Sequence, residues 1–227
     1  DRAVVEQFDT SDPEALRRGL RQARLALGKK QAVVIPTDTH YALAVDALSA
    51  ASVDTLAELK GWDESPILQV LLPALSALPA LAGEVHPVVR ALTEEFWPGP
   101  LTIIVPSSST LQVNLGSWHQ AVAVRMTGHP VTAELLEETG PLAVSAAHTE
   151  NTFSESLEQV SEQAGERLGV ALIDPAVSWE FASPGSTVLD ARRLGEDPST
   201  LVVLRGGPIS KEQLAEVAGE NVLWAEA

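Results

Sequence analysis

The feature that most constrains the fold is an alternation, along the whole chain, of short apolar segments with amphipathic ones. Residues 32–35 are an apolar, β-branched run closed by Pro36, which predicts a buried strand. The amphipathic segment before it spans residues 11–28. Ser11 and Glu14 have the spacing of a capping box there, and Gly28 ends the apolar pattern. Alternation of this kind predicts an α/β fold, with a mixed sheet covered by helices.

The same patterns predict the other elements. We expect helices over 52–60, 88–97, 130–139 and 155–168, and a last helix that opens at Ser210 with Gln213 as its capping-box partner. We expect strands over 41–45, 67–72, 101–105, 121–126 and 142–145, and near residues 170, 187 and 201. Loops 106–120 and 174–185 are rich in Ser, Pro and Gly. Because no linker or repeat interrupts the pattern, we expect a single domain over residues 1–227.

The composition excludes several classes of site and protein. The chain has no cysteine, so disulfides, thiolate metal sites and cysteine nucleophiles are excluded. No apolar run approaches the roughly 20 residues needed to cross a bilayer, and no signal-peptide pattern opens the sequence. We therefore expect a cytoplasmic protein without a membrane partner.

The charge balance is strongly acidic, with 15 Lys and Arg against 31 Asp and Glu and a net charge of −16. A surface that binds nucleic acid is normally basic. The balance therefore disfavours a nucleic-acid partner unless the few cations gather in one place. Acidity that keeps the protein in solution is the simpler explanation.

A polar segment, Thr37 to Thr39, follows the predicted strand that ends at Pro36. Two hydroxyls and a carboxylate at a strand end suit a ligand site, because open α/β sheets bind ligands there. An ordinary turn, in which Thr and Asp bond to nearby backbone groups, explains them equally well. The five histidines lack metal-ligand spacing, and we assign no metal ligand. No Walker-type or Gly-x-Gly-x-x-Gly loop is present.

Five blocks, in order, resemble the YrdC family, which includes the threonylcarbamoyl-AMP synthases of tRNA modification. They are residues 36–41 (PTDTHY), 59–61 (LKG), 97–102 (WPGPLT), 122–125 (VAVR), and 186–190 (STVLD) leading to 204–207 (LRGG). The resemblance covers roughly residues 15–210. It implies a twisted mixed sheet with covering helices and a deep central cavity that binds ATP with Mg²⁺, L-threonine and bicarbonate.

The resemblance also implies roles for individual residues. Those expected to bind the amino acid are Thr37, Thr39, Arg125 and Ser186. Those expected to bind the nucleotide are Lys60, Trp62, Ser145 and Arg205, and Lys60 and Ser145 would also take part in the chemistry. For Arg125 we expect a two-pronged clamp on the threonine carboxylate. Trp62 would stack on a base, although it could instead cover apolar neighbours.

The sequence departs from the family pattern at two places that carry chemistry. Family members pair a Lys-x-Arg with a Ser-x-Asn, whereas here Trp62 stands for the arginine and Ala147 for the asparagine. Two interpretations therefore stay open. The protein is a nucleotidyltransferase like its relatives, or it keeps the cavity to bind nucleotide or RNA without chemistry. Some family members are credited with binding double-stranded RNA, which the net charge disfavours here.

Overall fold

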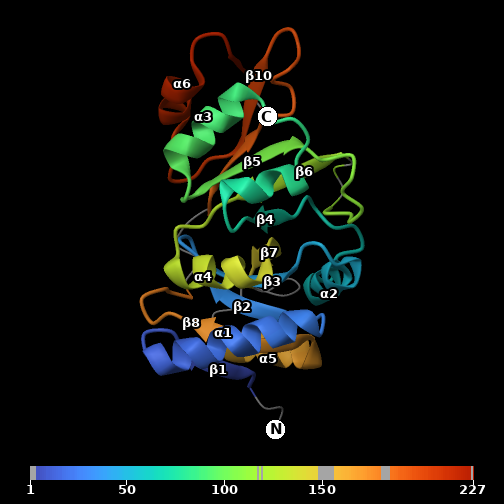
Figure 1. Ribbon diagram of the computed structural model, residues 1–227, viewed down its shortest axis with the longest axis vertical. Coiled ribbons are helices and arrows are strands. Elements are labelled where there is room, and N and C mark those ends of the chain that lie inside the picture. The colour runs from blue at the N-terminus through green and yellow to red at the C-terminus, as the bar shows by residue number, and fades with distance from the viewer. Residues whose placement is uncertain (1–3, 117, 119, 148–155, 180–184, 226) are drawn as a thin grey trace.

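The computed structural model describes residues 4–227 except 117, 119, 148–155, 180–184 and 226. All of its strands join one sheet (Figure 1) in the order β1-β8-β2-β3-β7-β4-β6-β5-β9-β10-β11. The strands are β1 Glu6–Asp9, β2 Ala32–Pro36, β3 Tyr41–Asp46, β4 Gln69–Leu71, β5 Leu101–Pro106, β6 Ala121–Arg125, β7 Leu142–Ala146, β8 Leu168–Ile173, β9 Thr187–Asp190, β10 Thr200–Arg205 and β11 Leu223–Ala225. The α-helices are α1 Pro13–Gly28, α2 Ala50–Lys60, α3 Pro87–Phe96, α4 Pro130–Thr139, α5 Leu157–Ala164 and α6 Lys211–Ala218.

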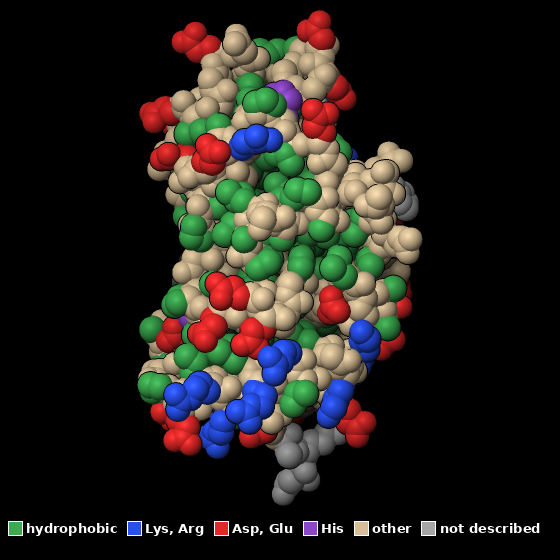
Figure 2. Space-filling model, in the orientation of Figure 1, with side chains coloured by type: hydrophobic (Ala, Val, Ile, Leu, Met, Phe, Trp, Pro, Cys, Tyr) green, Lys and Arg blue, Asp and Glu red, His purple; other side chains and the backbone are tan. Residues whose placement is uncertain are grey.

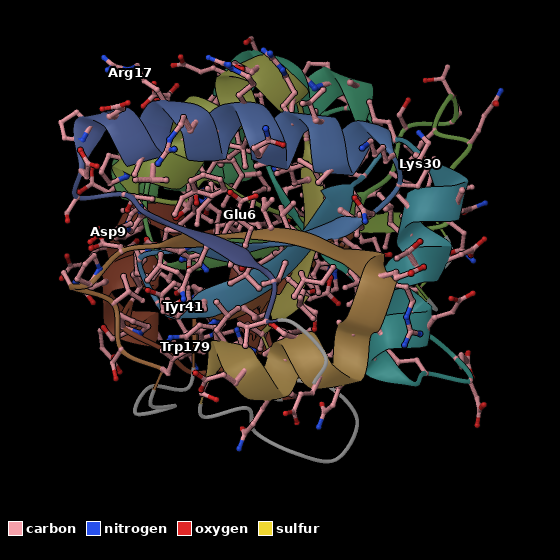
Figure 3. All side chains as sticks on the ribbon, turned by 90° about the horizontal axis from the view of Figure 1, so that it is seen from below. Glu6, Asp9, Arg17, Lys30, Tyr41 and Trp179 are labelled. Atoms are coloured by element: carbon pink, nitrogen blue, oxygen red, sulfur yellow. The ribbon has the colours of Figure 1, made fainter. Side chains whose placement is uncertain are left out.

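The central strands are buried on both faces, which explains their near-continuous apolar sequences. On β2, Val33 and Ile35 belong to one hydrophobic cluster, while Ala32 and Val34 belong to another. Successive side chains of a strand point to opposite faces, so the two clusters lie on the two sides of the sheet. Figure 3 shows α1 and α5 covering opposite faces at the end of the sheet that holds β1. The predicted mixed sheet with covering helices is confirmed.

Helix α1 begins one residue later than the sequence pattern suggests. Asp12 is its N-cap, with a side chain that accepts a hydrogen bond of 3.1 Å from the Glu14 N–H. The predicted capping box of Ser11 and Glu14 is therefore wrong. Ser11 instead donates through its backbone N–H to the Asp9 carboxylate at 2.9 Å. Two adjacent residues could cap this helix, and the contact with Asp9 decides between them.

Other element boundaries differ in ways that the backbone explains. The capping box of Ser210 and Gln213 at the start of α6 is confirmed. Helix α5 ends at Ala164 rather than near 168, since Gly165 leaves the helix with φ +56°. The expected start of that helix at residue 155 lies outside the described residues. The short edge strands β1 and β11 were not predicted, because three or four residues hold too little pattern.

Charge is distributed unevenly over the surface. Residues 17–30 carry six of the chain's 15 Lys and Arg, with no acidic residue among them. All six side chains are exposed on α1 and the turn after it, where Figure 2 shows a cluster of cations. In the rest of the view, most of the charged side chains are acidic. Among the described residues, no helix is long and apolar enough to cross a membrane.

Candidate functional site

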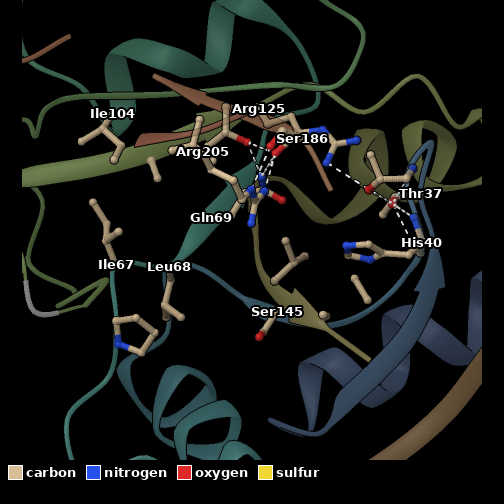
Figure 4. Close-up of a pocket in the computed structure, with 18 of the residues that line it drawn as sticks. Thr37, His40, Ile67, Leu68, Gln69, Ile104, Arg125, Ser145, Ser186 and Arg205 are labelled. Atoms are coloured by element: carbon tan, nitrogen blue, oxygen red, sulfur yellow. Dashed lines mark hydrogen bonds between the residues drawn. The ribbon is translucent and has the colours of Figure 1, made fainter. Parts of the chain in front are cut away.

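A cavity of about 320 Å³ lies over the middle of the sheet, between the loop after β2 and the strands β4, β5, β6, β9 and β10 (Figure 4). Its lining follows the period of the strands. On β6, Ala123 and Arg125 face the cavity, while Val122 and Val124 point into the main core on the other side. The volume is at the lower end of the range of about 300–1,000 Å³ usual for small-molecule sites. The fold thus places polar side chains from distant parts of the chain in one hollow.

Thr37 closes the loop that leaves β2. Its hydroxyl donates to the His40 carbonyl at 2.6 Å and accepts from the backbone N–H groups of Thr39 and His40 at 3.2 and 3.1 Å. Both Thr37 and Thr39 also line the cavity. The turn and the ligand interpretations of this segment are therefore compatible. The Thr37 hydroxyl fixes the loop, and the loop forms one wall of the cavity.

Arg125 at the end of β6 is 2 % exposed and held by three partners. Its Nε donates to the Gly99 carbonyl at 3.2 Å, its Nη1 to the Thr39 hydroxyl at 3.4 Å, and its Nη2 to the Asp38 carboxylate. Burial lowers the pKa of Arg125, and the charge of Asp38 opposes that shift. A guanidinium has five N–H donors in a fixed plane. Partners among the described residues use three of them, which leaves one on each terminal nitrogen for a ligand.

A second polar cluster surrounds the hydroxyl of Ser186. That oxygen accepts hydrogen bonds from Gln69 at 3.2 Å and from Arg205 Nη2 at 3.1 Å, and it lies 2.7 Å from the Thr102 hydroxyl. With both lone pairs engaged, its own proton is directed at Thr102. Arg205 also donates from Nε to the Ser186 carbonyl at 3.0 Å. Ser186 therefore orients Arg205, and burial lowers the pKa of that guanidinium.

Lys60, the last residue of α2, is 5 % exposed and does not itself line the cavity. Its Nζ donates to the Ala146 carbonyl at 2.9 Å and lies 5.8 Å from the centre of the Trp62 ring. Ala146 and Trp62 both line the cavity. Burial lowers the pKa of Lys60 to about 8. The helix ends here because Gly61 adopts φ +62°, which turns the chain towards Trp62.

The two departures from the family pattern have different surroundings. The Trp62 ring lines the cavity and also packs against the main core, so both interpretations of this residue describe its contacts. Ala147 is 3 % exposed and belongs to that core. Its backbone N–H donates to the Tyr41 carbonyl at 3.0 Å. The Ala147 side chain offers no polar group to a guest.

The structure brings most of the predicted site residues together. Those that line the cavity are Thr37, Thr39, Trp62, Arg125, Ser145, Ser186 and Arg205. Lys60 lies behind the wall formed by Ala146. Sequence reasoning included Asp38 in a polar segment that suits a ligand site, but it missed His40, Gln69 and Thr102 as part of the site. The signal for the last two was a polar residue inside an otherwise apolar strand, at a position that faces the cavity.

The remaining histidines and acids show no metal-binding arrangement. His86 and His129 cap α3 and α4 by accepting from backbone N–H groups, and His129 also lies 2.7 Å from Asp174. His119 and His148 lie outside the described residues. Within the described part of the chain, no three His, Asp or Glu side chains form a group that could hold a metal ion.

Comparison with known proteins places the chain in a family. The family model that matches residues 26–207 is that of Sua5, YciO and YrdC, described as telomere recombination. The chain belongs to the Sua5–YciO–YrdC family. A Mycobacterium tuberculosis protein, provisionally named a threonylcarbamoyl-AMP synthase, is 38% identical over 95% of this chain and 96% of its own length. The threonylcarbamoyl-AMP synthase of Bacillus subtilis is 29% identical, and the matched region is 95% of this chain and 60% of that protein.

Solved structures of the Sua5–YciO–YrdC family share this architecture. Pyrococcus abyssi Sua5, in a complex with L-threonine, superimposes with a TM-score of 0.77 at 27% identity, over 96% of this chain. The matched region is 62% of that chain, so this protein spans about three fifths of it. E. coli YciO superimposes with a TM-score of 0.73 at 18% identity, over 93% and 98% of the two chains, which shows the fold alone.

Proposed function

We propose that this protein binds ATP and L-threonine in the cavity and forms threonylcarbamoyl-AMP. The observation that supports the proposal most directly is the presence of two guanidiniums, the buried Arg125 and the more exposed Arg205, on the lining of one hollow of an acidic protein. Each is held by side-chain and backbone partners, and the charge of Arg205 is felt at Arg125. Two fixed cations this close together suit a guest that carries more than one negative charge.

The proposed reaction uses several anions. The neutral amine of threonine combines with bicarbonate to give a carbamate and water. A carbamate oxygen then attacks the α-phosphorus of ATP, and the bond to the leaving pyrophosphate breaks. Positioned positive charge is the main catalytic contribution to phosphoryl transfer of this kind. Mg²⁺ would enter with the triphosphate as part of the substrate.

The described contacts assign a part to each residue. The two remaining donors of Arg125 are available to a carboxylate beside Thr39, whose hydroxyl is already oriented. Arg205, fixed by Ser186, would meet the phosphates. Lys60 would add charge behind Ala146, with Ser145 as a neighbouring hydroxyl on the same strand. The apolar wall formed by Ile67, Ile104 and Val188 would accept a flat or aliphatic part of the guest.

A second candidate is favoured by Trp62 and Ala147, because neither supplies the polar group that family members have there. A protein of this kind would bind nucleotide in the cavity without turning it over. A cytoplasmic location and a place in tRNA modification stay predictions, and double-stranded RNA binding has no support in the cavity's contacts.

One experiment separates the two candidates. The purified protein is incubated with ATP, L-threonine, bicarbonate and Mg²⁺, and the release of pyrophosphate and the formation of the adenylate are followed. Turnover that requires threonine is the expected result. Binding of ATP without pyrophosphate release would support the second candidate instead. The variant Arg205→Met is expected to lose turnover, whereas Arg167→Met, at the exposed end of the 3-10 helix Gly165–Arg167 and outside the cavity, is expected to keep it.

A further inference from the structure

The imidazole of His40 projects into the cavity from the loop between β2 and β3 (Figure 4). Its Nδ1 lies 3.0 Å from the carbonyl oxygen of Tyr41. A carbonyl oxygen can only accept, so the hydrogen bond requires the proton on Nδ1. In the neutral ring, the lone pair is then on Nε2. The backbone of the next residue thus selects the tautomer that has its basic nitrogen on the other side of the ring.

The Nε2 side of the His40 ring faces the part of the cavity that holds Arg205. A side chain at Gly185 would come within 3.5 Å of His40 Nε2 and 3.1 Å of Arg205 Nη2, so both nitrogens border the same point. Gly185 has φ +84°, a conformation that glycine adopts without strain. The close approach keeps this space free of a β-carbon. The basic nitrogen of His40 therefore lies at the edge of the hollow in which Arg205 is expected to hold an anion.

The residue that holds the His40 ring, Tyr41, is buried and held by its own contacts. Tyr41 is 2 % exposed, its phenol donates to the Asp174 carbonyl at 2.7 Å, and its ring stacks on Trp179 at a centroid distance of 4.3 Å. The Tyr41 carbonyl that fixes His40 also accepts from the Ala147 N–H at 3.0 Å. A catalytic group needs this kind of second layer to hold its orientation.

We propose that His40 is a further catalytic residue, the base that takes a proton from the amino group of the amino-acid substrate before that group is carboxylated. This role rests on the proposed function. The N–H bond of the ammonium breaks and its proton passes to Nε2, which leaves a neutral amine and an imidazolium. The amine nitrogen then forms a bond to the carbon of bicarbonate, and carbamate and water result. The conversion of one ammonium and one bicarbonate into one carbamate and one water releases a single proton, and the imidazole accepts it.

The charged groups around His40 fit this role better than the alternatives. Arg205 on β10 and Arg125 on β6 are cations that also line the cavity, and they suit the negatively charged bicarbonate and the carbamate formed from it. Asp38, in the same loop, is paired with Arg125. Lys60 on α2 donates from Nζ to the Ala146 carbonyl and does not itself line the cavity.

The test compares His40→Asn with the wild-type protein. Asparagine can keep a donor near the position of Nδ1 but has no titratable nitrogen. A positioned base contributes a factor of roughly 10²–10⁴ to rate, so we expect kcat/KM for threonine to fall about 100-fold. The wild-type rate should fall as pH drops from 8 to 5, where an imidazole gains its proton, and this limb should be absent in His40→Asn. Added imidazole should restore His40→Ala at least tenfold.

His86→Asn is the matched control, because asparagine also caps a helix and His86 lies outside the cavity. It should keep wild-type activity and its pH profile. Activity of His40→Asn within threefold of wild type, an unchanged acidic limb, or no rescue by imidazole would each overturn the role of His40 alone. An inactive wild-type protein would overturn the proposed function and this role together, so the two failures are distinguishable.

Discussion

The guanidinium of Arg125, at the end of β6, is paired with the carboxylate of Asp38 in the loop after β2. The pair joins two segments that are far apart in sequence. Thr127 reinforces it by donating from its hydroxyl to the same Asp38 oxygen at 2.9 Å. The orientation of the cation in the cavity therefore depends on an acid that does not line the cavity itself.

This relationship predicts that Asp38→Ala is costly. Removing one partner of a buried ion pair leaves an uncompensated charge, which costs about 3–5 kcal/mol when both groups are buried. Because the side chain of Asp38 is 21 % exposed, we expect the free energy of unfolding to fall by less than that, about 2 kcal/mol, measured by urea denaturation. Glu138→Gln is the control, since its pair with Arg24 is exposed and worth about 0–1 kcal/mol. Equal effects of the two substitutions would contradict the prediction.

Because Lys60 is buried, we expect the free energy of unfolding to depend on pH. Its pKa is about 8 in the folded protein, against an ordinary value of 10.5. Between these values the unfolded chain binds more protons, so stability rises with pH. The burial cost is fully present below pH 8 and disappears towards pH 10.5. In Lys60→Met this rise, about 3 kcal/mol in total, should be absent from urea denaturation curves.

Lys29→Met, at an exposed turn, controls for the general loss of a lysine. If the wild type and Lys60→Met kept the same stability difference at pH 7 and pH 10, the buried ammonium would not be the source of the effect.

We expect that no side chain is tolerated at position 185, which is a glycine in this protein. Alanine there would be strained at φ +84° and would press on Arg205 and His40. Left-handed backbone at a residue other than glycine costs about 1–3 kcal/mol. We expect Gly185→Ala to lower the free energy of unfolding by about that amount and to weaken ATP binding measured by calorimetry. Gly195→Ala, with nothing within 4 Å of the added carbon, should change neither. Unaltered ATP affinity in Gly185→Ala would show that this space is not used.

Trp62 predicts a fluorescence response. If a base stacks on its ring, ATP should quench the emission of the wild-type protein, and Trp62→Phe should lose most of the quenching. Base–aromatic stacking is worth about 1–3 kcal/mol, so binding should weaken at least about fivefold if phenylalanine stacks poorly. Trp224→Phe is a close control, since that ring also has a lysine nitrogen 5.8 Å from its centre but lies on the edge strand β11. Quenching that survives in Trp62→Phe would place the base elsewhere.

The sequence predicted the order and kind of nearly all long elements, because their apolar periods are strong. The prediction was wrong where two adjacent residues could both serve as the N-cap of a helix, as Ser11 and Asp12 could, and it missed strands that are too short to show a period. Family blocks identified Arg125, Ser186 and Arg205, but not their partners. The contacts among Gln69, Thr102 and Ser186 depend on the strand order β4-β6-β5-β9, in which β6 lies between β4 and β5. Such contacts follow from strand register, and no local pattern encodes them.

The lining of the cavity begins at Thr37 and ends at Arg205. No contiguous fragment shorter than this span can hold a complete site, so the protein cannot be reduced to a small independent recognition module. A ligand that contacts both the loop after β2 and the Arg205 side chain of β10 links two segments that are far apart in the sequence. Occupancy of the cavity therefore requires that the segments from Thr37 to Arg205 have folded together.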